Sequence, residues 1–391
     1  MPEFPARKLF LAFTLILLLL CVFTVLVSSE GRPTVSARAA VLYEPCTARF
    51  LYEKNADARL PMASTTKIMT ALVAIRHGNL DEEAEIPDAA VGIEGSSLYL
   101  KHGERLTRRE LLYGVLLRSA NDASFALAEI VSGSVDAFVA EMNETAERLG
   151  LSGTHFENPH GLDAEGHYTT AKDLALLAAA ALDDPVFAEI CSSKSARIGA
   201  DENCRLLHNH NKLLSLYDGA VGVKTGYTKK DGRCLVGAAT RDGLTFISVT
   251  LDAPDDWRDH KNLLDLGFSL LKCEKLAVPG EHFYELPVLG GECPTVSVCN
   301  EEELSLVRAR SAAPLTEKLY LSPYPAAPIR KGDVLGTLLF LDENGEKVAA
   351  LPLTATTDVN KKQEKSFFYR IFHKDRSWKK SDFRNSLPTW D

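Results

Sequence analysis

Residues 60–71 read Leu-Pro-Met-Ala-Ser-Thr-Thr-Lys-Ile-Met-Thr-Ala, and they open a predicted helix that runs from about Ser64 to Arg76. Pro61 leads into this helix, and apolar residues recur along one of its faces. Lys67 lies one helical turn after Ser64 and shares its face. The start of a helix also offers unpaired backbone N–H groups and the positive end of the helix dipole, which favour an oxyanion. The stretch therefore predicts a serine nucleophile with a lysine beside it.

Two further short motifs follow in the chain. Ser119-Ala120-Asn121 lies where one predicted helix ends and the next begins, so its polar side chains can point into a cleft. Lys224-Thr225-Gly226 follows a short apolar segment that is typical of a strand edge. Gly226 lets a substrate backbone approach closely, and a lysine charge beside a threonine hydroxyl suits a terminal carboxylate. The same lysine charge can depress the pKa of Lys67, which a role as base requires.

Each of these motifs is weak evidence by itself, because short patterns of this kind recur by chance in a chain of this length. Ser64 alone could be a helix cap with Lys67 a solvated charge. Asn121 alone could start the following helix, and Lys224 could be an ordinary strand lysine. Found together in one chain and in this order, the motifs favour acyl transfer through a serine ester.

Composition limits the partners and the compartment. The chain has 391 residues with 46% hydrophobic content, which is enough for a full core and predicts two domains. It has 44 Lys and Arg against 53 Asp and Glu, a formal net charge of −9, which disfavours nucleic acid as a partner. Seven cysteines follow the N-terminal apolar run without a CxxC spacing, and buried free thiols are the favoured interpretation, although their pairing stays open. Two pairs are candidates for disulfides: Cys191–Cys204 and Cys293–Cys299.

Both ends of the chain carry membrane signals. Arg7 and Lys8 precede the uncharged apolar run 9–27, which predicts a cleaved secretory signal or a retained anchor within residues 1–31. We therefore expect the rest of the chain to lie outside the cytoplasm. Residues 359–391 are basic and aromatic, with Phe367, Ile371 and Trp378 near helical spacing. They favour an amphipathic segment on an anionic membrane surface, and a disordered basic tail is the alternative.

The order of elements predicts an α+β fold in residues 32–275. Strands are expected near its start, helices follow, and two strands joined by Asp242-Gly243 come near its end. A sheet closed by both ends of the domain explains this order better than alternating βαβ units. Residues 276–358 show short apolar runs separated by Pro and Gly, which predict a small all-β domain.

At the three motifs the chain resembles the low-molecular-mass penicillin-binding proteins, specifically the D-alanyl-D-alanine carboxypeptidases. The resemblance covers about residues 39–268 and is looser beyond them. It implies the fold shared by β-lactamases and transpeptidases, an antiparallel sheet with helices on both faces, followed by a small all-β domain. Four segments carry the resemblance: 60–71, 116–123, 222–228, and 158–163 leading into 169–173.

The resemblance also implies a role for each motif residue. Ser64 would be the acylated nucleophile, Lys67 its general base and Ser119 the proton relay to the departing D-alanine. The substrate would be held by Asn121 at its amide, by Lys224 and Thr225 at its carboxylate, beside Gly226, and by an oxyanion hole from the N–H groups of Ser64 and Tyr227. The expected partners are peptidoglycan stem peptides ending in D-Ala-D-Ala, β-lactam antibiotics and the membrane surface, on the outer face of the bacterial cytoplasmic membrane or in the cell wall. No metal or organic cofactor is implied, and His208-Asn209-His210 fits no standard zinc spacing.

Three alternatives stay open. A β-lactamase needs fast deacylation from a positioned glutamate, and Glu157 is the one acid near the corresponding segment, in a different setting. A DD-endopeptidase that cuts cross-links is poorly separated from a carboxypeptidase by sequence. A non-catalytic peptidoglycan-binding protein is disfavoured because the motif residues are intact.

Overall fold

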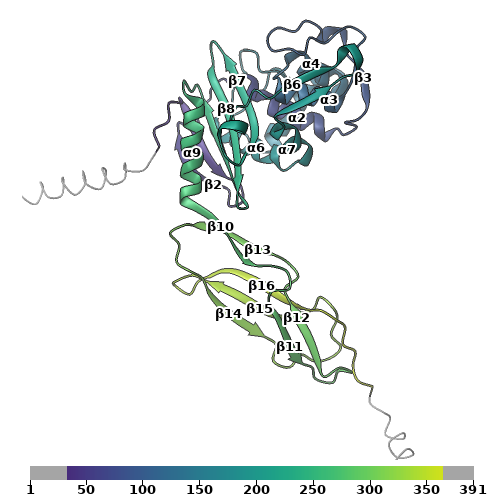
Figure 1. Cartoon of the computed structure of the whole chain (residues 1–391), viewed down its shortest axis with the longest axis vertical. Helices are drawn as coiled ribbons and strands as arrows, with labels where there is room; N and C mark the ends of the chain where they lie inside the picture. Colours follow the sequence, from purple (N-terminus) through teal and green to yellow (C-terminus); the bar gives the residue numbers. More distant parts are fainter. Residues whose placement is uncertain (1–32, 364–391) are drawn as a thin grey trace, which may run out of the picture. The chain divides into compact units, whose positions relative to one another are not determined.

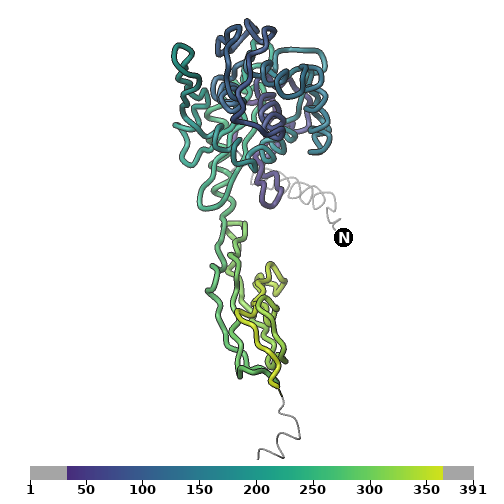
Figure 2. The backbone as a smooth tube through the Cα atoms, turned by 90° about the vertical axis from the view of Figure 1, so that its right-hand side faces the viewer, coloured from purple at the N-terminus to yellow at the C-terminus, as the bar shows by residue number. Residues whose placement is uncertain are grey.

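The computed structural model describes residues 33–363, which divide into two compact units. The first unit runs to Cys273 and includes Val307–Ser311, whereas the second comprises Glu274–Leu306 and the described residues from Ala312 onward. Figure 2 shows the second unit, in green to yellow, as built from the C-terminal part of the chain. The predicted N-terminal signal and nearly all of the predicted basic tail lie outside the described residues.

A five-stranded antiparallel sheet forms the centre of the first unit (Figure 1). Its strands are β1 (Ala39–Glu44), β2 (Arg49–Lys54), β7 (Ala220–Thr228), β8 (Gly232–Arg241) and β9 (Leu244–Leu251). Their order is β2-β1-β9-β8-β7, so strands from the start of the chain pair with strands from its end. Ala39 lies opposite Leu251 and Tyr43 opposite Ile247. This arrangement confirms the predicted α+β fold.

The turn between β8 and β9 explains why this hairpin was readable from sequence. Asp242 and Gly243 both have positive φ, 50° and 76°, as a tight two-residue hairpin turn of the type I′ class requires. Across the two strands Thr240 and Thr245 pair through their hydroxyl groups, 2.8 Å apart. The turn therefore sets the register of the strand pair that carries β7 on its outer edge.

Helices cover both faces of the sheet, as the predicted fold class requires. Alternate residues of β1 enter different cores: Val41 packs into the larger hydrophobic cluster, and Leu42 into a second cluster with Leu263 of α9 (Asp256–Leu270). Figure 1 shows α9 against one face, with α2 (Lys67–Arg76) and α6 (Ala171–Leu182) on the other. The strands are therefore buried on both sides.

The remaining helices of the first unit are α3 (Arg108–Leu117), α4 (Asn121–Ser132), α5 (Val135–Arg148), α7 (Pro185–Ser192) and α8 (Leu213–Leu216). Thr107 forms a capping box with Glu110 at the start of α3, and Ser134 caps α5. Within residues 33–363 no single helix is both long and apolar enough to cross a bilayer. One pair of consecutive helices, α4 and α5, has that length and hydropathy when taken together, but the chain bends by 88° between them.

The sequence does not predict two small antiparallel sheets of two strands each. They consist of β3 (Glu83–Glu85) with β4 (Arg105–Thr107), and β5 (Ser195–Ile198) with β6 (Arg205–His208). Short 3₁₀ turns η2 (Asp88–Ala90) and η3 (Asp201–Asn203) accompany them. Strands of three or four mostly polar residues carry too little alternation to be recognised from sequence.

The second unit is all β, as predicted. Its main sheet has the order β11-β12-β16-β15-β14, around a core that includes Leu286, Val298 and Leu353. The strands are β11 (Phe283–Pro287), β12 (Thr295–Cys299), β14 (Thr316–Leu321), β15 (Val334–Leu341) and β16 (Lys347–Ala355), and a two-stranded sheet joins β10 (Leu271–Ala277) to β13 (Leu304–Ala309). Only β11, β15 and β16 correspond to predicted apolar runs. The edge strand β14 was missed because nearly all of its side chains are exposed.

Every cysteine that the structure describes is a free thiol. Neither of the two candidate disulfides is formed. Cys191 and Cys234 are buried, whereas Cys46, Cys204 and Cys293 are exposed.

Candidate active site

Ser64 lies in η1 (Ala63–Thr66), a 3₁₀ turn that runs directly into α2. The sequence predicts an α-helix from Ser64, whereas the α-helix begins only at Lys67. The reason is local: Ala63 has a positive φ of 46°, a conformation that side chains with a Cβ rarely adopt. The Thr66 hydroxyl donates to the Ala63 carbonyl at 2.8 Å and holds this turn. The Ser64 hydroxyl is therefore presented by a strained, hydrogen-bonded turn.

Lys67 is fully buried below Ser64, with 0% of its surface exposed. Its Nζ lies 3.0 Å from Ser64 Oγ and 2.7 Å from Asn121 Oδ1, and it also donates to the His160 carbonyl. Burial lowers the pKa of Lys67 well below its ordinary value, the charge of Lys224 lowers it further, and Asp122 opposes both. A neutral amine can act as a base, so burial gives Lys67 the chemistry that its place in the motif suggested.

Ser119 and Asn121 come from the junction between α3 and α4, as predicted. Ser119 has a positive φ of 60°, which turns the chain sharply before α4 and directs its hydroxyl to Lys224, 3.0 Å away. Asn121 is 4% exposed and accepts from Lys67, while its Nδ2 donates to the Glu94 carbonyl at 2.6 Å. The Asn121 amide therefore links Lys67 to the loop around Glu94 through two hydrogen bonds.

Lys224 lies on β7, the edge strand beside η1, and is 1% exposed. Its Nζ donates to Ser119 Oγ and, at 2.8 Å, to the Thr225 carbonyl. Burial lowers the pKa of Lys224 to about 7. A methyl group at Gly226 would lie 3.1 Å from the Ser64 nitrogen, so glycine lets the strand approach the nucleophile closely.

These residues meet at one cleft of about 310 Å³. Ser64, Ser119, Thr225, Gly226 and Tyr227 line it, and Tyr227 is 63% exposed. Lys67, Asn121 and Lys224 lie behind this lining, connected to it through the hydrogen bonds given above. The structure thus brings together all eight residues that the sequence singled out.

The cleft also contains groups that the sequence analysis did not select. His210 and Trp257 line it, and the Arg118 guanidinium donates to His210 Nε2 at 3.0 Å. In the sequence His210 stands out only within His208-Asn209-His210, which fits no standard zinc spacing, and Trp257 carries no motif signal. Burial, with the charges of Arg118 and Lys224, lowers the pKa of His210. A neutral imidazole ring is consistent with accepting the arginine hydrogen bond.

The loop 157–170 closes the floor beneath Ser64 and Lys67. A methyl group at Gly161 would lie 2.0 Å from the Ala63 carbonyl oxygen, so this glycine is required for the loop to pack against η1. Since the Thr66 hydroxyl already donates to Ala63, His167 Nε2 donates to Thr66, at 2.7 Å. His167 Nδ1 accepts from the backbone N–H of Glu157. Burial lowers the pKa of His167 to about 4, in keeping with this neutral tautomer.

Comparisons with known proteins agree with this geometry. The family model of D-alanyl-D-alanine carboxypeptidases matches residues 26–255, and that of the C-terminal domain of penicillin-binding protein 5 matches residues 272–361. The chain is 33% identical to the carboxypeptidase DacF of Bacillus subtilis, over 83% of this chain and 86% of that protein. It is 34% identical to DacC of Escherichia coli, over 87% and 88%.

Solved structures give the same result. Penicillin-binding protein 5 of Haemophilus influenzae superposes with a TM-score of 0.61 at 29% identity, covering 84% of this chain and 99% of that one. The DD-transpeptidase of Streptomyces K15 superposes with a TM-score of 0.59 at 35% identity, covering 61% of this chain and 99% of that one. With a catalytic serine motif, matching fold and matching family models, the chain belongs to the D-alanyl-D-alanine carboxypeptidase family.

Proposed function

We propose that this chain removes the terminal D-alanine from peptidoglycan stem peptides ending in D-Ala-D-Ala, through an ester formed on Ser64. The observation that carries the proposal is the buried Lys67 amine, 3.0 Å from the Ser64 hydroxyl and with a lowered pKa. A serine hydroxyl is a weak nucleophile until an adjacent base takes its proton. Lys67 is that base.

The hydrogen bonds of Lys67 fit a neutral amine. Such an amine has two N–H donors and one lone pair. Asn121 Oδ1 and the His160 carbonyl accept the two N–H groups. The lone pair then faces Ser64 Oγ, whose hydroxyl donates to it before the proton is transferred. Asn121 acts here by orienting the base, in addition to the contact with the substrate amide that the family resemblance implies.

The substrate binds along the free edge of β7. Its terminal carboxylate is held by the Thr225 hydroxyl and the charge of Lys224, which explains a preference for the end of a peptide chain. The scissile carbonyl oxygen lies between the backbone N–H groups of Ser64 and Tyr227. Ser64 stands at the first turn of a helix, where N–H groups lack intrahelical acceptors, so its N–H can stabilise the developing oxyanion.

Ser119 completes the acylation step. Its hydroxyl lies 3.0 Å from Lys224 Nζ, so a proton can pass through it to the departing nitrogen of D-alanine. Water then attacks the ester, releases the shortened peptide and restores Ser64. Every step is carried by side chains and backbone groups of the cleft.

A β-lactam presents a carboxylate and a reactive carbonyl to the same groups, and we propose that it acylates Ser64. The β-lactamase alternative is less well supported. Glu157 pairs with His155 at 3.4 Å, with its side chain 41% exposed. Slow turnover of benzylpenicillin by the purified protein is the expected result, and rapid turnover would favour a β-lactamase.

The direct test is D-alanine release from a synthetic peptide ending in D-Ala-D-Ala. We expect the wild-type protein to release D-alanine, Ser64→Ala to lose the activity, and Ser305→Ala, an exposed serine of the second unit, to keep it. Release by folded Ser64→Ala at the wild-type rate would contradict the assignment of the nucleophile.

We further propose that the enzyme acts outside the cytoplasm and that its basic C-terminal segment contacts the membrane. The support is the charge and hydropathy of residues 9–27 and 359–391 in the sequence. With the N-terminal segment removed, truncation after Asn360 should weaken co-sedimentation with anionic lipid vesicles. Unchanged sedimentation would refute a membrane role for the tail.

A further inference from the structure

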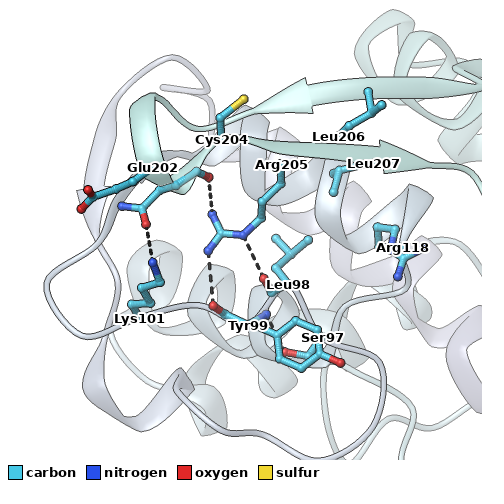
Figure 3. Close-up of a pocket in the computed structure, with 11 residues that line it drawn as sticks. Ser97, Leu98, Tyr99, Lys101, Arg118, Glu202, Cys204, Arg205, Leu206 and Leu207 are labelled. Carbon is cyan, nitrogen blue, oxygen red and sulfur yellow. Dashed lines mark hydrogen bonds between the residues drawn. The ribbon is translucent and has the colours of Figure 1, made fainter.

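Two buried acids of the first unit, Glu104 and Asp231, differ in how their surroundings match a negative charge. Glu104 is 4% exposed and forms an ion pair with Arg205. Figure 3 shows that the same guanidinium donates to the carbonyls of Leu98 (2.9 Å) and Tyr99 (3.3 Å), which line a pocket of about 450 Å³. The charge of Glu104 is therefore compensated where it is buried.

Asp231, in the turn between β7 and β8, is buried without a matching donor. Its exposed fraction is 3%, and among the described residues no hydrogen bond reaches its Oδ1. Its backbone N–H donates to Thr228 Oγ1 at 2.9 Å, which keeps the turn compact. Burying a carboxylate without a compensating charge is costly, so this side chain favours its neutral, protonated form.

The group that faces the Asp231 side chain is a second acid. Asp163 belongs to the loop 157–170, here called the floor loop, and forms a hydrogen bond with the Asp231 carboxyl. Two ionised carboxylates have no proton to donate, so this hydrogen bond requires that one of them is protonated. Asp231 is buried and Asp163 is exposed, so Asp231 holds the proton and donates it to the Asp163 carboxylate. One shared proton therefore links the floor loop to the turn after β7.

The charged groups around the pair set the pH at which this proton is lost. Burial, with the charge and hydrogen bond of Asp163, raises the pKa of Asp231 to about 6, and the Thr228 hydroxyl and the Lys230 charge oppose the rise. On β8 the Cys234 thiol is uncharged, because burial raises its pKa to about 12. The other charged groups near this thiol are Asp252 and the ion pair of Arg233 with Asp256. The shared proton is therefore lost as the pH rises through about 6.

Both of the linked segments take part in the active site. In the floor loop Gly161 packs against η1, and the neighbouring His160 carbonyl accepts from Lys67. The turn that contains Asp231 follows Tyr227 on β7, whose N–H belongs to the oxyanion hole proposed above. The hydrogen bond between the two acids therefore connects the segment that orients the base to the strand that receives the substrate.

We propose that Asp231 is a positioning residue, which fixes the floor loop through a proton shared with Asp163, so that the cleft is ordered in mildly acidic surroundings and loosens when this proton is lost. The consequence for turnover rests on the function proposed above, whereas the hydrogen bond itself does not. Once both carboxylates are charged they repel one another, and the His160 carbonyl holds Lys67 less firmly. Acylation then slows, because a small misplacement of a catalytic group lowers the rate strongly.

Hydrogen exchange tests this hydrogen bond without a substrate. Mass spectrometry on the full-length protein would measure amide exchange in the floor loop at about pH 5 and about pH 8, corrected for the intrinsic effect of pH. We expect wild-type protection to fall about fivefold or more between these values. Asp231→Asn keeps the shape and donates an N–H at every pH, so its protection should change less than about twofold. Asp136→Asn, an exposed acid of α5, is the matched control and should follow the wild type.

Turnover provides the second measurement. The ratio of kcat for D-alanine release, Asp231→Asn over wild type, cancels the titration of Lys67 and Lys224, because Asp231 is not among the charges that shift either pKa. This ratio should be near one at about pH 5 and rise about fivefold by about pH 8. The same ratio for Asp136→Asn should stay near one at both values.

Each outcome decides one part of the proposal. Wild-type protection that does not depend on pH, or an equal loss of protection in wild type and Asp231→Asn, would overturn the shared proton. Protection that depends on pH together with a constant kcat ratio would overturn the positioning role. A protein that releases no D-alanine at either pH would instead overturn the proposed function, while the exchange result still decides the hydrogen bond.

Discussion

The two units of the chain treat charged side chains in opposite ways. In the first unit Lys67 and Lys224 are almost completely buried within one cleft, whereas the buried polar side chain of the described second unit is the uncharged Asn300. Non-glycine residues with positive φ, among them Ala63 and Ser119, also occur in the first unit and not in the described second unit. Buried charge and backbone strain destabilise a fold, so the presence of both at the cleft, in Lys67 and Lys224 and in Ala63 and Ser119, indicates that they serve chemistry there.

The largest contrast should come from a lysine in each unit. Lys67→Met should lower D-alanine release and penicillin acylation about 10³-fold, because it removes the base beside Ser64. Lys318→Met, on the exposed strand β14, should leave both unchanged. Activity of folded Lys67→Met within tenfold of wild type would show that another group activates the serine.

A second contrast uses two glycines with similar positive φ. Gly161 (φ 84°) packs against the nucleophile turn, whereas Gly280 (φ 78°), in the second unit, has open space around it. Gly161→Ala should cost about 3 kcal/mol or more in urea unfolding, because strain and overpacking add, and Gly280→Ala only about 1–2 kcal/mol from strain. Equal losses would mean that the contact with Ala63 is not tight.

The pH dependence should separate the two buried lysines. Lys67 must be neutral to accept a proton, so acylation should fall as pH drops through its lowered pKa. Lys224 must be charged to hold a carboxylate, so KM should rise several-fold per pH unit above its pKa of about 7. A peptide with an amidated C-terminus lacks the carboxylate, and its KM should not show this rise. The same rise with both peptides would contradict a carboxylate contact with Lys224.

The burial of Lys224 should also appear in stability. Its pKa of about 7 in the folded protein lies below the roughly 10.4 of an unfolded lysine, so between these values only the unfolded chain holds the proton. Wild-type stability should therefore increase with pH across this window, by up to about 1.4 kcal/mol per pH unit from this group. Lys224→Met should be more stable at neutral pH and show a smaller slope. An identical slope in both proteins would contradict a buried, neutralised lysine.

The smallest effect belongs to an exposed ion pair of the second unit. Lys275 and Glu303 lie 2.9 Å apart with side chains 57% and 46% exposed. Lys275→Ala should cost less than about 1 kcal/mol in urea unfolding, and less still at high salt. A loss as large as that of Gly161→Ala would show that the second unit also depends on charge pairing.

Much of the fold was predictable because its signals are local. The β8–β9 turn follows from Asp242-Gly243, and the start of α3 from its capping box. The β5–β6 hairpin and the edge strand β14 were missed because short or exposed strands need no apolar alternation. Their pairing is decided by neighbours distant in sequence, which no local window contains.

The site was predictable as a set of residues but not as a network. The motifs identified Ser64, Lys67 and Lys224, which the structure brings together. They could not identify the His160 carbonyl that accepts from Lys67, because a backbone acceptor has no side-chain signature. They also missed the pairing of Arg118 with His210, which depends on tertiary packing. The positive φ of Ala63 also has no signal in the sequence, so the start of the α-helix at Lys67 instead of Ser64 could not be predicted.

The central claim is that a buried, neutral Lys67 activates Ser64. Mass spectrometry of the protein labelled with benzylpenicillin tests it most directly, with peptide mapping of the adduct. The account predicts one adduct, on the peptide containing Ser64, that is absent from Ser64→Ala and strongly reduced in folded Lys67→Met. An adduct on another residue, or full labelling of Lys67→Met, would contradict it.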